Sequence, residues 1–319
     1  MCRRFKFCTL WCLLIALVVF AAGCRPSSNV PTPVAHVAGT PTLAVAGAST
    51  PTPMPGEPLA ARVNGQPIRL QEYQKQVAEW EAAFVGQNPN LSEADKQAMI
   101  AQGKQQVLDV MIEQVLIEQA AAQAGIVISD QDVESVVARD IQDNGGQAKF
   151  EAWLQTNNWT VDEYRSRQRS MMIASRMFEH ITRDVPTKAE QVHARHILVA
   201  TEQEARTILS QLQGGTDFVA LAAQHSLDPS TKDSGGDLGF FPRGTLVVPE
   251  VENTAFSLGV GQISDVFSSA MGYHIVQVIE RVPDMTLTEE SWQSLKETTF
   301  RRWLLDLWDT ASIEVLVSP

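Results

Sequence analysis

The sequence predicts an α+β protein with a series of helices, then a small mixed domain, then a returning helix. Apolar residues recur at helical spacing from Leu70 to about Asp184, and Pro186 ends that pattern. Short apolar runs typical of strands then alternate with capped helices up to about residue 284. The last long segment, Thr288–Ala311, is an amphipathic helix that needs a partner surface, and the preceding helices are the expected one.

The chain begins with the features of an export signal. Basic residues precede an apolar run, Leu10–Ala22, that is too short to span a bilayer core of about 30 Å, which takes roughly 20 helical residues. The run ends in "AAGC", which resembles a bacterial lipobox, although Ala21 stands where such boxes usually carry leucine. We therefore expect a lipoprotein signal over residues 1–24, a lipid on Cys24, and membrane anchoring outside the cytoplasm. An ordinary signal cut at the small residues, or an uncleaved anchor, is the alternative.

Cysteine usage fits a chain whose chemistry does not depend on thiols. The four cysteines are Cys2, Cys8, Cys12 and Cys24, all inside the predicted signal or at its end. The rest of the sequence therefore has no disulfide framework, zinc-thiolate site or thiol nucleophile. Residues 25–58 follow as a stretch rich in Pro, Thr and Ala without helical or strand period, which predicts an extended tether.

The charge balance is acidic, since 25 Lys and Arg stand against 37 Asp and Glu, for a net charge of −12. Nucleic-acid binding needs clustered cations that neutralise phosphates, and the sequence has no basic stripe. Nucleic acid is therefore not an expected partner, and solubility is the simplest role of the acidic excess.

Residues 59–187 predict a helical domain that opens with a pair of strands. The stretch "LAARVNGQPI" is broken by the hairpin dipeptide Asn64-Gly65. Thr160 and Glu163 form a capping box at the start of a long helix. The predicted helices are Leu70–Val85, Ser92–Ala124, a segment from Ser129 to about Ile141, Lys149–Gln155, and a segment from Thr160 to about Asp184.

Residues 188–284 predict a small domain in the order strand, helix, helix, strand, helix, strand, strand. Thr201 and Glu204 form another capping box, for a helix that ends at Gly214-Gly215. The glycine-rich stretch "DSGGDLGFF" takes the place of the second strand. The other predicted elements are strands at Ala194–Ala200, Ile263–Phe267 and Tyr273–Val282, and helices at Asp217–His225 and Val251–Ser257.

The glycines of "DSGGDLGFF" (Gly235, Gly236 and Gly239) are also typical of a phosphate-binding loop. Such a loop continues into Gly-Lys-Ser/Thr, which is absent here, and the aspartates Asp233 and Asp237 would repel an anion. The dinucleotide spacing Gly-x-Gly-x-x-Gly is not met either. The stretch therefore does not predict a nucleotide partner.

Separated motifs of the second domain agree in order and spacing with one family. The motifs "ARHILV", "HSLDPSTKDSGGDLGFFPRG", "TAFSLGVGQIS" and "GYHIVQV" resemble the parvulin peptidyl-prolyl isomerase domain over about residues 190–282. The preceding segment, with "ARVNGQPI" and "GIVISDQDV", is similar to the N-terminal chaperone region of SurA-like and PrsA-like extracytoplasmic foldases. The resemblance implies a four-stranded antiparallel sheet with helices within 188–284. It also implies that a C-terminal helix and strand, within 285–319, pack on the helical domain.

The resemblance implies the active-site residues as well. His196 and His274 match the paired histidines at the floor of the parvulin site. Asp228 stands where cytosolic relatives have Cys, and Ser269 where many members have Thr. Their implied task is a hydrogen-bond network near the carbonyl that twists during isomerisation. Asp in place of Cys argues against a nucleophilic mechanism.

The resemblance further implies a pocket for the proline ring, at Leu238, Leu246 and Val251. Family members usually have Phe at the last position, and "GTLVVPEVENTAF" carries one extra residue, which leaves the neighbouring valine as an alternative to Leu246. Phe256 or Phe267 is expected to fill the space that the smaller valine leaves. No cluster of Lys or Arg lies near these residues, so a phosphorylated substrate is not expected.

The sequence therefore predicts an enzyme that isomerises X–Pro bonds in unfolded exported polypeptides without a cofactor or metal. A metal site at His193-x-x-His196 is disfavoured, because residues three apart in a strand face opposite sides. The main alternative is a holdase that binds unfolded clients and has a weak or inactive parvulin domain. A solute-binding lipoprotein is less well supported, because it would need two α/β lobes.

Overall fold

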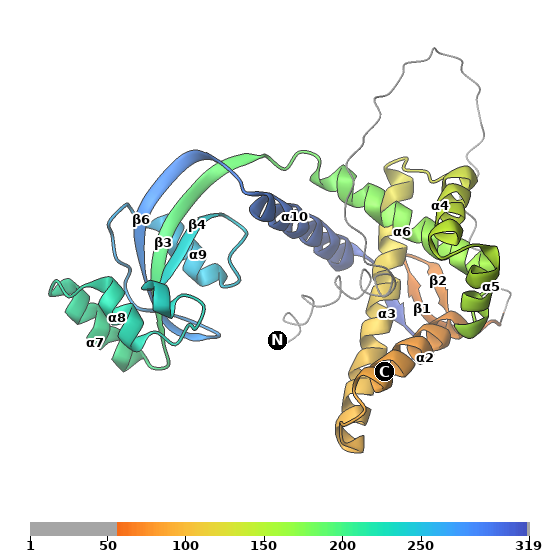
Figure 1. Cartoon of the computed structure of the whole chain (residues 1–319), viewed down its shortest axis with the longest axis horizontal. Helices are drawn as coiled ribbons and strands as arrows, with labels where there is room; N and C mark the ends of the chain where they lie inside the picture. Colours follow the sequence, from red (N-terminus) through yellow and green to blue (C-terminus); the bar gives the residue numbers. More distant parts are fainter. Residues whose placement is uncertain (1–55, 318–319) are drawn as a thin grey trace, which may run out of the picture. The chain divides into compact units, whose positions relative to one another are not determined.

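The computed structural model describes residues 56–317 and confirms the α+β class, with helices and two antiparallel sheets (Figure 1). The predicted signal, the lipidation site Cys24 and most of the predicted tether lie outside the described residues. No helix among residues 56–317 combines the length and the apolar character that crossing a bilayer requires.

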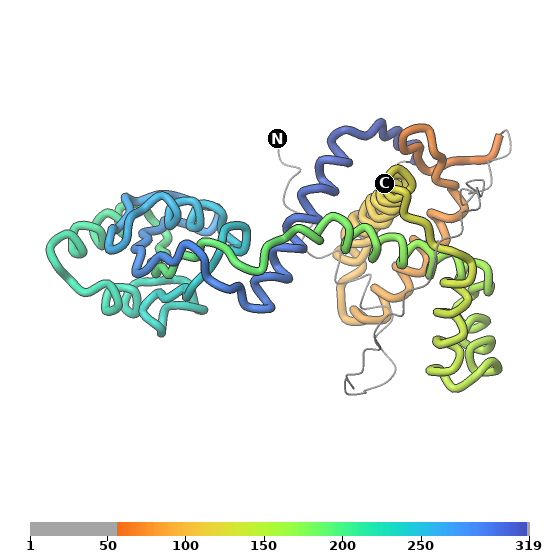
Figure 2. Tube along the Cα trace, turned by 90° about the horizontal axis from the view of Figure 1, so that it is seen from above, coloured from red at the N-terminus to blue at the C-terminus, as the bar shows by residue number. Residues whose placement is uncertain are grey.

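The described chain divides into two compact units. The first unit contains the residues up to Met177 together with those from Asp306 onward, and the second unit is Phe178–Leu305. The chain therefore leaves the first unit once, through the end of helix α6 (Val161–Thr182), and returns once, along helix α10 (Glu289–Thr310), as the colours of Figure 2 show.

The first unit is built on a three-stranded sheet in the order β2-β1-β7. Strand β1 (Leu59–Val63) turns at Asn64-Gly65 into β2 (Gln66–Arg69), so the predicted hairpin is confirmed. The turn needs both of these residues at positive φ, 50° for Asn64 and 83° for Gly65. Strand β7 (Ile313–Val315) pairs with the other edge of β1, so the last strand within residues 56–317 joins the first.

Helices α2 (Leu70–Gln87) and α3 (Glu93–Gln123) supply most of the core of the first unit. Leu108 and Ile112 of α3 are among its largest fully buried side chains. Trp308 of α10 packs against the same core. The first unit therefore buries its apolar surface partly with the end of the chain.

Helices α4 (Asp130–Asp143), α5 (Gln147–Thr156) and α6 enclose a smaller core of their own. Ser129 and Asp132 form a capping box at α4, and Thr160 and Glu163 exchange the same pair of bonds at α6. These caps satisfy backbone N–H groups that a first helical turn otherwise leaves without partners, which explains where both helices begin.

The second unit is a four-stranded antiparallel sheet in the order β4-β3-β6-β5. Its strands are β3 (Lys188–Val199), β4 (Asp237–Pro242), β5 (Phe267–Ser269) and β6 (Gly272–Thr286). Helices α7 (Glu202–Gln213) and α8 (Phe218–His225) pack on Ile197, Val199 and Ile275 of one face. Helix α9 (Pro249–Ser257) packs with Ala194, Val276 and Val278 of the other face.

The predicted strand Ile263–Phe267 is wrong for most of its length. Ile263 makes only an isolated bridge with Gln277, and β5 begins at Phe267. The buried Ser264 explains the irregularity, because its backbone N–H donates to the Val276 carbonyl while its hydroxyl accepts the Val276 N–H at 2.9 Å. A side chain thus replaces the backbone partner that a regular strand would offer.

Candidate active site

Strand alternation brings His196 and His274 to the same face of the sheet. Side chains of a strand alternate between faces, so His196 follows Ala194, and His274 precedes Val276, on the face that α9 covers. In the register of β3 and β6, His196 is opposite Val276 and His274 is opposite Leu198, which makes the two histidines diagonal neighbours. Their rings lie 5.8 Å apart between centroids and within 18° of parallel.

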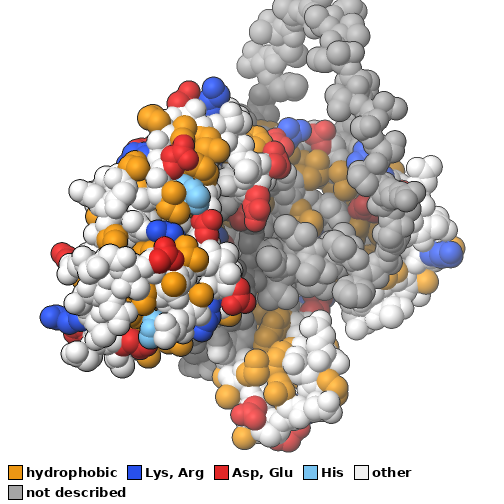
Figure 3. Space-filling model, turned by 60° about the vertical axis from the view of Figure 1, so that its left-hand side comes forward, with side chains coloured by type: hydrophobic (Ala, Val, Ile, Leu, Met, Phe, Trp, Pro, Cys, Tyr) orange, Lys and Arg blue, Asp and Glu red, His pale blue; other side chains and the backbone are white. Residues whose placement is uncertain are grey.

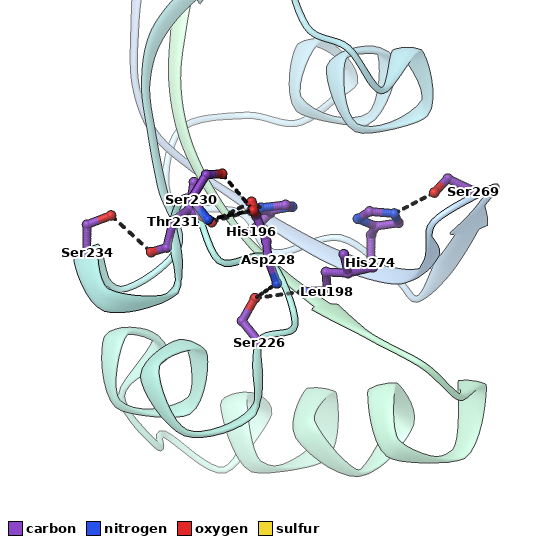
Figure 4. A network of polar contacts seen from close by, with 9 residues as sticks. All are labelled: His196, Leu198, Ser226, Asp228, Ser230, Thr231, Ser234, Ser269 and His274. Atoms are coloured by element: carbon purple, nitrogen blue, oxygen red, sulfur yellow. Dashed lines mark hydrogen bonds and ion pairs between the residues drawn. The ribbon is translucent and has the colours of Figure 1, made fainter. Parts of the chain in front are cut away.

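His196 is tied to the loop after α8. Its Nε2 lies 2.7 Å from Oδ2 of Asp228 and 3.1 Å from Oγ1 of Thr231 (Figure 4). Thr231 donates its hydroxyl to the same Asp228 oxygen at 2.7 Å, and His196 is only 6% exposed. Because an ionised carboxylate only accepts, the contact assigns the proton of a neutral His196 ring to Nε2.

Asp228 is held by hydroxyl and amide groups on both sides. Ser230 donates its N–H and its hydroxyl to Oδ1, at 3.0 and 2.6 Å. Burial by itself would raise the pKa of Asp228, but the hydrogen bonds from Ser230, Thr231 and His196 outweigh it and hold that pKa below its usual range. The carboxylate is therefore charged at neutral pH and committed to orienting His196.

His274 has a partner of its own. Ser269 places its hydroxyl 2.7 Å from His274 Nε2, and that hydroxyl accepts the Met271 N–H at 3.0 Å. His274 is fully buried, and burial, with His196 close by, lowers its pKa from 6.5 to about 4. His274 is therefore a neutral imidazole at physiological pH. Nδ1 of both histidines is buried without a hydrogen-bond partner among the described residues.

Three residues of this network, Ser226, Ser230 and Thr231, were missed in the sequence. Thr231 links His196 and Asp228, and Ser226 accepts the backbone N–H groups of Leu198 and Asp228. All three lie within three positions of Asp228 in "SLDPST", and Ser, Thr and Asp at such spacing are typical of side chain to backbone bonds in tight loops. This spacing is the sequence signal from which they could have been predicted.

The stretch "DSGGDLGFF" forms the approach to this loop and the edge strand β4. A short 3₁₀ turn (Lys232–Ser234) leads to Gly236, whose φ is +84°. Gly236 accepts the His196 N–H at 2.8 Å through its carbonyl and donates its own N–H to Thr231 at 2.8 Å. A Cβ built on Gly236 would lie 2.1 Å from the His196 carbonyl oxygen. A glycine is therefore required where the loop passes the histidine backbone.

The five predicted pocket residues gather in one apolar cluster beside the histidines. Val251 and Phe256 are buried, and Leu238, Leu246 and Phe267 pack against them half-buried. Phe267 also stacks on His274, with centroids 5.4 Å apart and 17° between the rings.

Leu246 and its alternative, Val247, differ in burial. Leu246 packs against the cluster, whereas Val247 is 93% exposed.

On the face shown in Figure 3, acidic and basic side chains of the second unit are scattered among hydrophobic ones rather than gathered in one patch.

This arrangement suits a reaction that needs no covalent intermediate. It offers an apolar surface, a neutral imidazole and a carboxylate-oriented imidazole, with a hydroxyl partner at each ring. Among residues 56–317, Asp228 is the carboxylate bonded to the pair, and its hydrogen bonds occupy both of its oxygens.

Two family models match the chain. A PPIC-type PPIase domain matches residues 180–280, and a SurA-like N-terminal domain matches residues 3–178. Foldase protein PrsA from Caldanaerobacter subterraneus subsp. tengcongensis is 33% identical over 238 residues, which cover 69% of this chain and 72% of that protein. Foldase protein PrsA 4 from Bacillus cereus is 28% identical over 222 residues, which cover 67% of this chain and 75% of that protein.

A solved structure, the peptidylprolyl isomerase PrsA from Bacillus anthracis, has 29% sequence identity and a TM-score of 0.47, and the match covers 64% of this chain and 94% of that one. The family models and the PrsA relatives agree with the resemblance seen in the sequence motifs. The chain therefore belongs to the PrsA-like foldases, which join a SurA-like N-terminal domain to a PPIC-type domain, and it is a peptidyl-prolyl cis-trans isomerase.

Proposed function

We propose that the chain isomerises X–Pro bonds by stabilising a twisted amide, with no covalent step. Rotation about the peptide bond faces a barrier of about 18–20 kcal/mol because the amide loses conjugation. Lowering that barrier by about 4 kcal/mol accelerates exchange roughly a thousandfold. An active site that binds the twisted form better than the planar one supplies this without a nucleophile.

The observation that carries the mechanism is the pair of near-parallel histidines beside an apolar cluster. We assign the proline ring to the half-buried side chains Leu238, Leu246 and Phe267, with Val251 and Phe256 beneath them. His196 and His274 then lie beside the amide that twists. Their orientation is fixed by Asp228 and Ser269, so the field at the carbonyl is set before the substrate binds.

We place this activity outside the cytoplasm, at a membrane surface. The support is the lipobox-like "AAGC" and the Pro-rich stretch that follows Cys24. In this proposal residues 25–58 form a tether, 59–187 a chaperone domain, 188–284 the isomerase domain, and 285–319 a returning segment. The substrates are unfolded or partly folded exported polypeptides that contain X–Pro bonds.

The prolyl isomerase assay tests the mechanism directly. We expect the chain without residues 1–24 to accelerate cis-to-trans conversion of an Ala-Pro or Leu-Pro peptide. Replacing His274→Ala should lower kcat/KM at least about tenfold, because it removes a preoriented electrostatic group. His180→Ala is the matched control, since His180 is exposed and belongs to α6. Equal rates for the wild type and His274→Ala would refute the assigned role.

One observation favours the holdase alternative. Val251, which stands where the family usually has Phe, is 2% exposed and lies within the cluster rather than at its surface. A smaller side chain there weakens the hold on a proline ring. Two measurements on the same protein separate the functions. A holdase suppresses aggregation of an unfolded client, but at the same concentration it leaves prolyl exchange in the peptide assay at its uncatalysed rate.

Membrane tethering is tested at Cys24. We expect the full chain, expressed in a bacterium that processes lipoproteins, to incorporate a radiolabelled fatty acid and to sediment with membranes. The Cys24→Ala variant should incorporate no label, because the acceptor thiol is gone. Cys12→Ala is the control, since Cys12 lies inside the predicted signal. Label retained by Cys24→Ala would contradict lipidation at this residue.

A further inference from the structure

Glu252 is a buried carboxylate that the isomerase mechanism does not use. It lies in the first turn of α9, directly after Val251, and is 8% exposed. A carboxylate buried to this extent needs hydrogen bonds to offset the water it has lost. The source of those bonds shows what the residue does.

Three successive backbone N–H groups point at Glu252. Gly244 donates to Oε1 at 2.8 Å, and Thr245 and Leu246 donate to Oε2 at 3.1 and 3.2 Å. These donors belong to the connection between β4 and α9, which has no regular secondary structure to bind its amides. The Glu252 side chain therefore takes the place of a backbone ladder for this loop.

The same loop is held from two further directions. Thr298 of α10 donates its hydroxyl to the Gly244 carbonyl at 3.1 Å, and Thr245 donates its own hydroxyl to the Pro242 carbonyl at 3.0 Å. Five hydrogen bonds thus fix the backbone on which the Leu246 side chain is mounted. Leu246 turns toward the apolar cluster while its neighbour Val247 turns to solvent.

We propose that Glu252 is a positioning residue for the proline site. It binds the loop backbone so that Leu246 stays against the cluster, and it does not touch the substrate itself. This inference rests on the proposed proline site, and it adds the group that keeps one wall of that site in place. It also accounts for the extra residue in "GTLVVPEVENTAF", since a longer loop needs more fixed points to hold one conformation.

A glutamate suits this task better than any neutral group. Three converging N–H donors require a partner that only accepts, and an ionised carboxylate offers two oxygens with several lone pairs. Glutamine has almost the same shape, but its amide would turn an NH₂ donor toward donors of the loop. The substitution Glu252→Gln therefore leaves one acceptor oxygen and breaks the bonds made at the other, with little change of volume.

The test compares KM and kcat for a Leu-Pro peptide in the chain without residues 1–24. We expect Glu252→Gln to raise KM about tenfold, the scale of losing hydrogen bonds to a charged group, and to leave kcat within about twofold. In parallel, hydrogen exchange of the Thr245 and Leu246 amides should speed up, while the histidine network keeps its wild-type NMR signals. Glu280→Gln is the charge-matched control, because Glu280 is exposed on β6.

An unchanged KM in Glu252→Gln, or a lower kcat at constant KM, would overturn the inference. Should this variant fail to fold, Thr298→Val removes one bond from the opposite side of the loop, and a raised KM at constant kcat is again the expected result. An unchanged KM in Thr298→Val would then count against it. A wild type and Glu280→Gln that are both inactive would refute the proposed function instead, so the two failures are distinguishable.

Discussion

Replacing Gly236 by alanine should unfold the second unit and abolish isomerase activity. The added Cβ would lie 2.1 Å from the His196 carbonyl oxygen and 3.2 Å from the His196 nitrogen, both of which are backbone atoms that cannot rotate away. Relief requires β3 to separate from the loop, which breaks the bond from His196 N–H to the Gly236 carbonyl. Together with the cost of a positive φ, we expect a loss of at least about 4 kcal/mol.

The other two glycines of "DSGGDLGFF", Gly235 and Gly239, serve as controls for this substitution. Gly239 also has a positive φ, of +66°, but no atom lies within 4 Å of a Cβ placed there, so Gly239→Ala should cost only about 1–2 kcal/mol. Gly235 is intermediate, because its Cβ would meet the movable side chain of Val219 at 2.6 Å. Denaturant unfolding of the three variants measures the order. Equal midpoints for Gly236→Ala and Gly239→Ala would show that the close approach to His196 is unimportant.

The second unit is expected to lose stability in mild acid because of His274. Burial and the neighbouring His196 lower the pKa of His274 from 6.5 to about 4. Between these two pH values the unfolded chain binds a proton at this residue and the folded chain does not. The free energy of unfolding therefore rises with pH across this window, and the contribution of His274 is fully present above it. At about 1.36 kcal/mol per pH unit, the contribution amounts to about 3 kcal/mol.

Denaturant unfolding between pH 4 and 7 measures this effect as a difference between variants. His274→Gln should lose the pH dependence in this window, and His180→Gln should keep it. The variants must be compared with the wild type, because Glu113 in the first unit has the opposite effect on stability. Burial and Asp109 raise the pKa of Glu113 to about 7, so its contribution to the free energy of unfolding falls as the pH rises. Asp228 titrates below the window, because its pKa lies under the usual value of 3.8. A wild-type slope in His274→Gln would contradict the prediction.

Local patterns in the sequence were enough to predict the elements that depend on neighbouring residues. The Asn64-Gly65 turn and the caps at Ser129 and Thr160 are formed by residues within a few positions of each other, so their signals are complete in a short window. The motif resemblance placed His196, Asp228, Ser269 and His274 in one site, and the structure brings these four side chains together.

What escaped prediction depends on residues far apart or on a side chain replacing a backbone partner. The motif resemblance implied that a C-terminal strand packs on the helical domain, but no local pattern encodes its pairing with β1. Ser264 interrupts the predicted strand Ile263–Phe267, because its hydroxyl takes the place of a backbone partner. Glu252 looked like an ordinary acidic residue of a first helical turn, and only its three loop donors distinguish it.

The β1–β7 pairing also determines the order in which the two sheets of the protein can form. Synthesis from the N-terminus produces β1 and β2 long before Ile313–Val315. Until then one edge of β1 is open, and the first core lacks Trp308. The sheet of the second unit draws all its strands from residues 188–286 and can close earlier. The first unit therefore begins first but is completed last. The four-stranded sheet of the second unit can form before the three-stranded sheet whose strands lie on either side of it in the sequence.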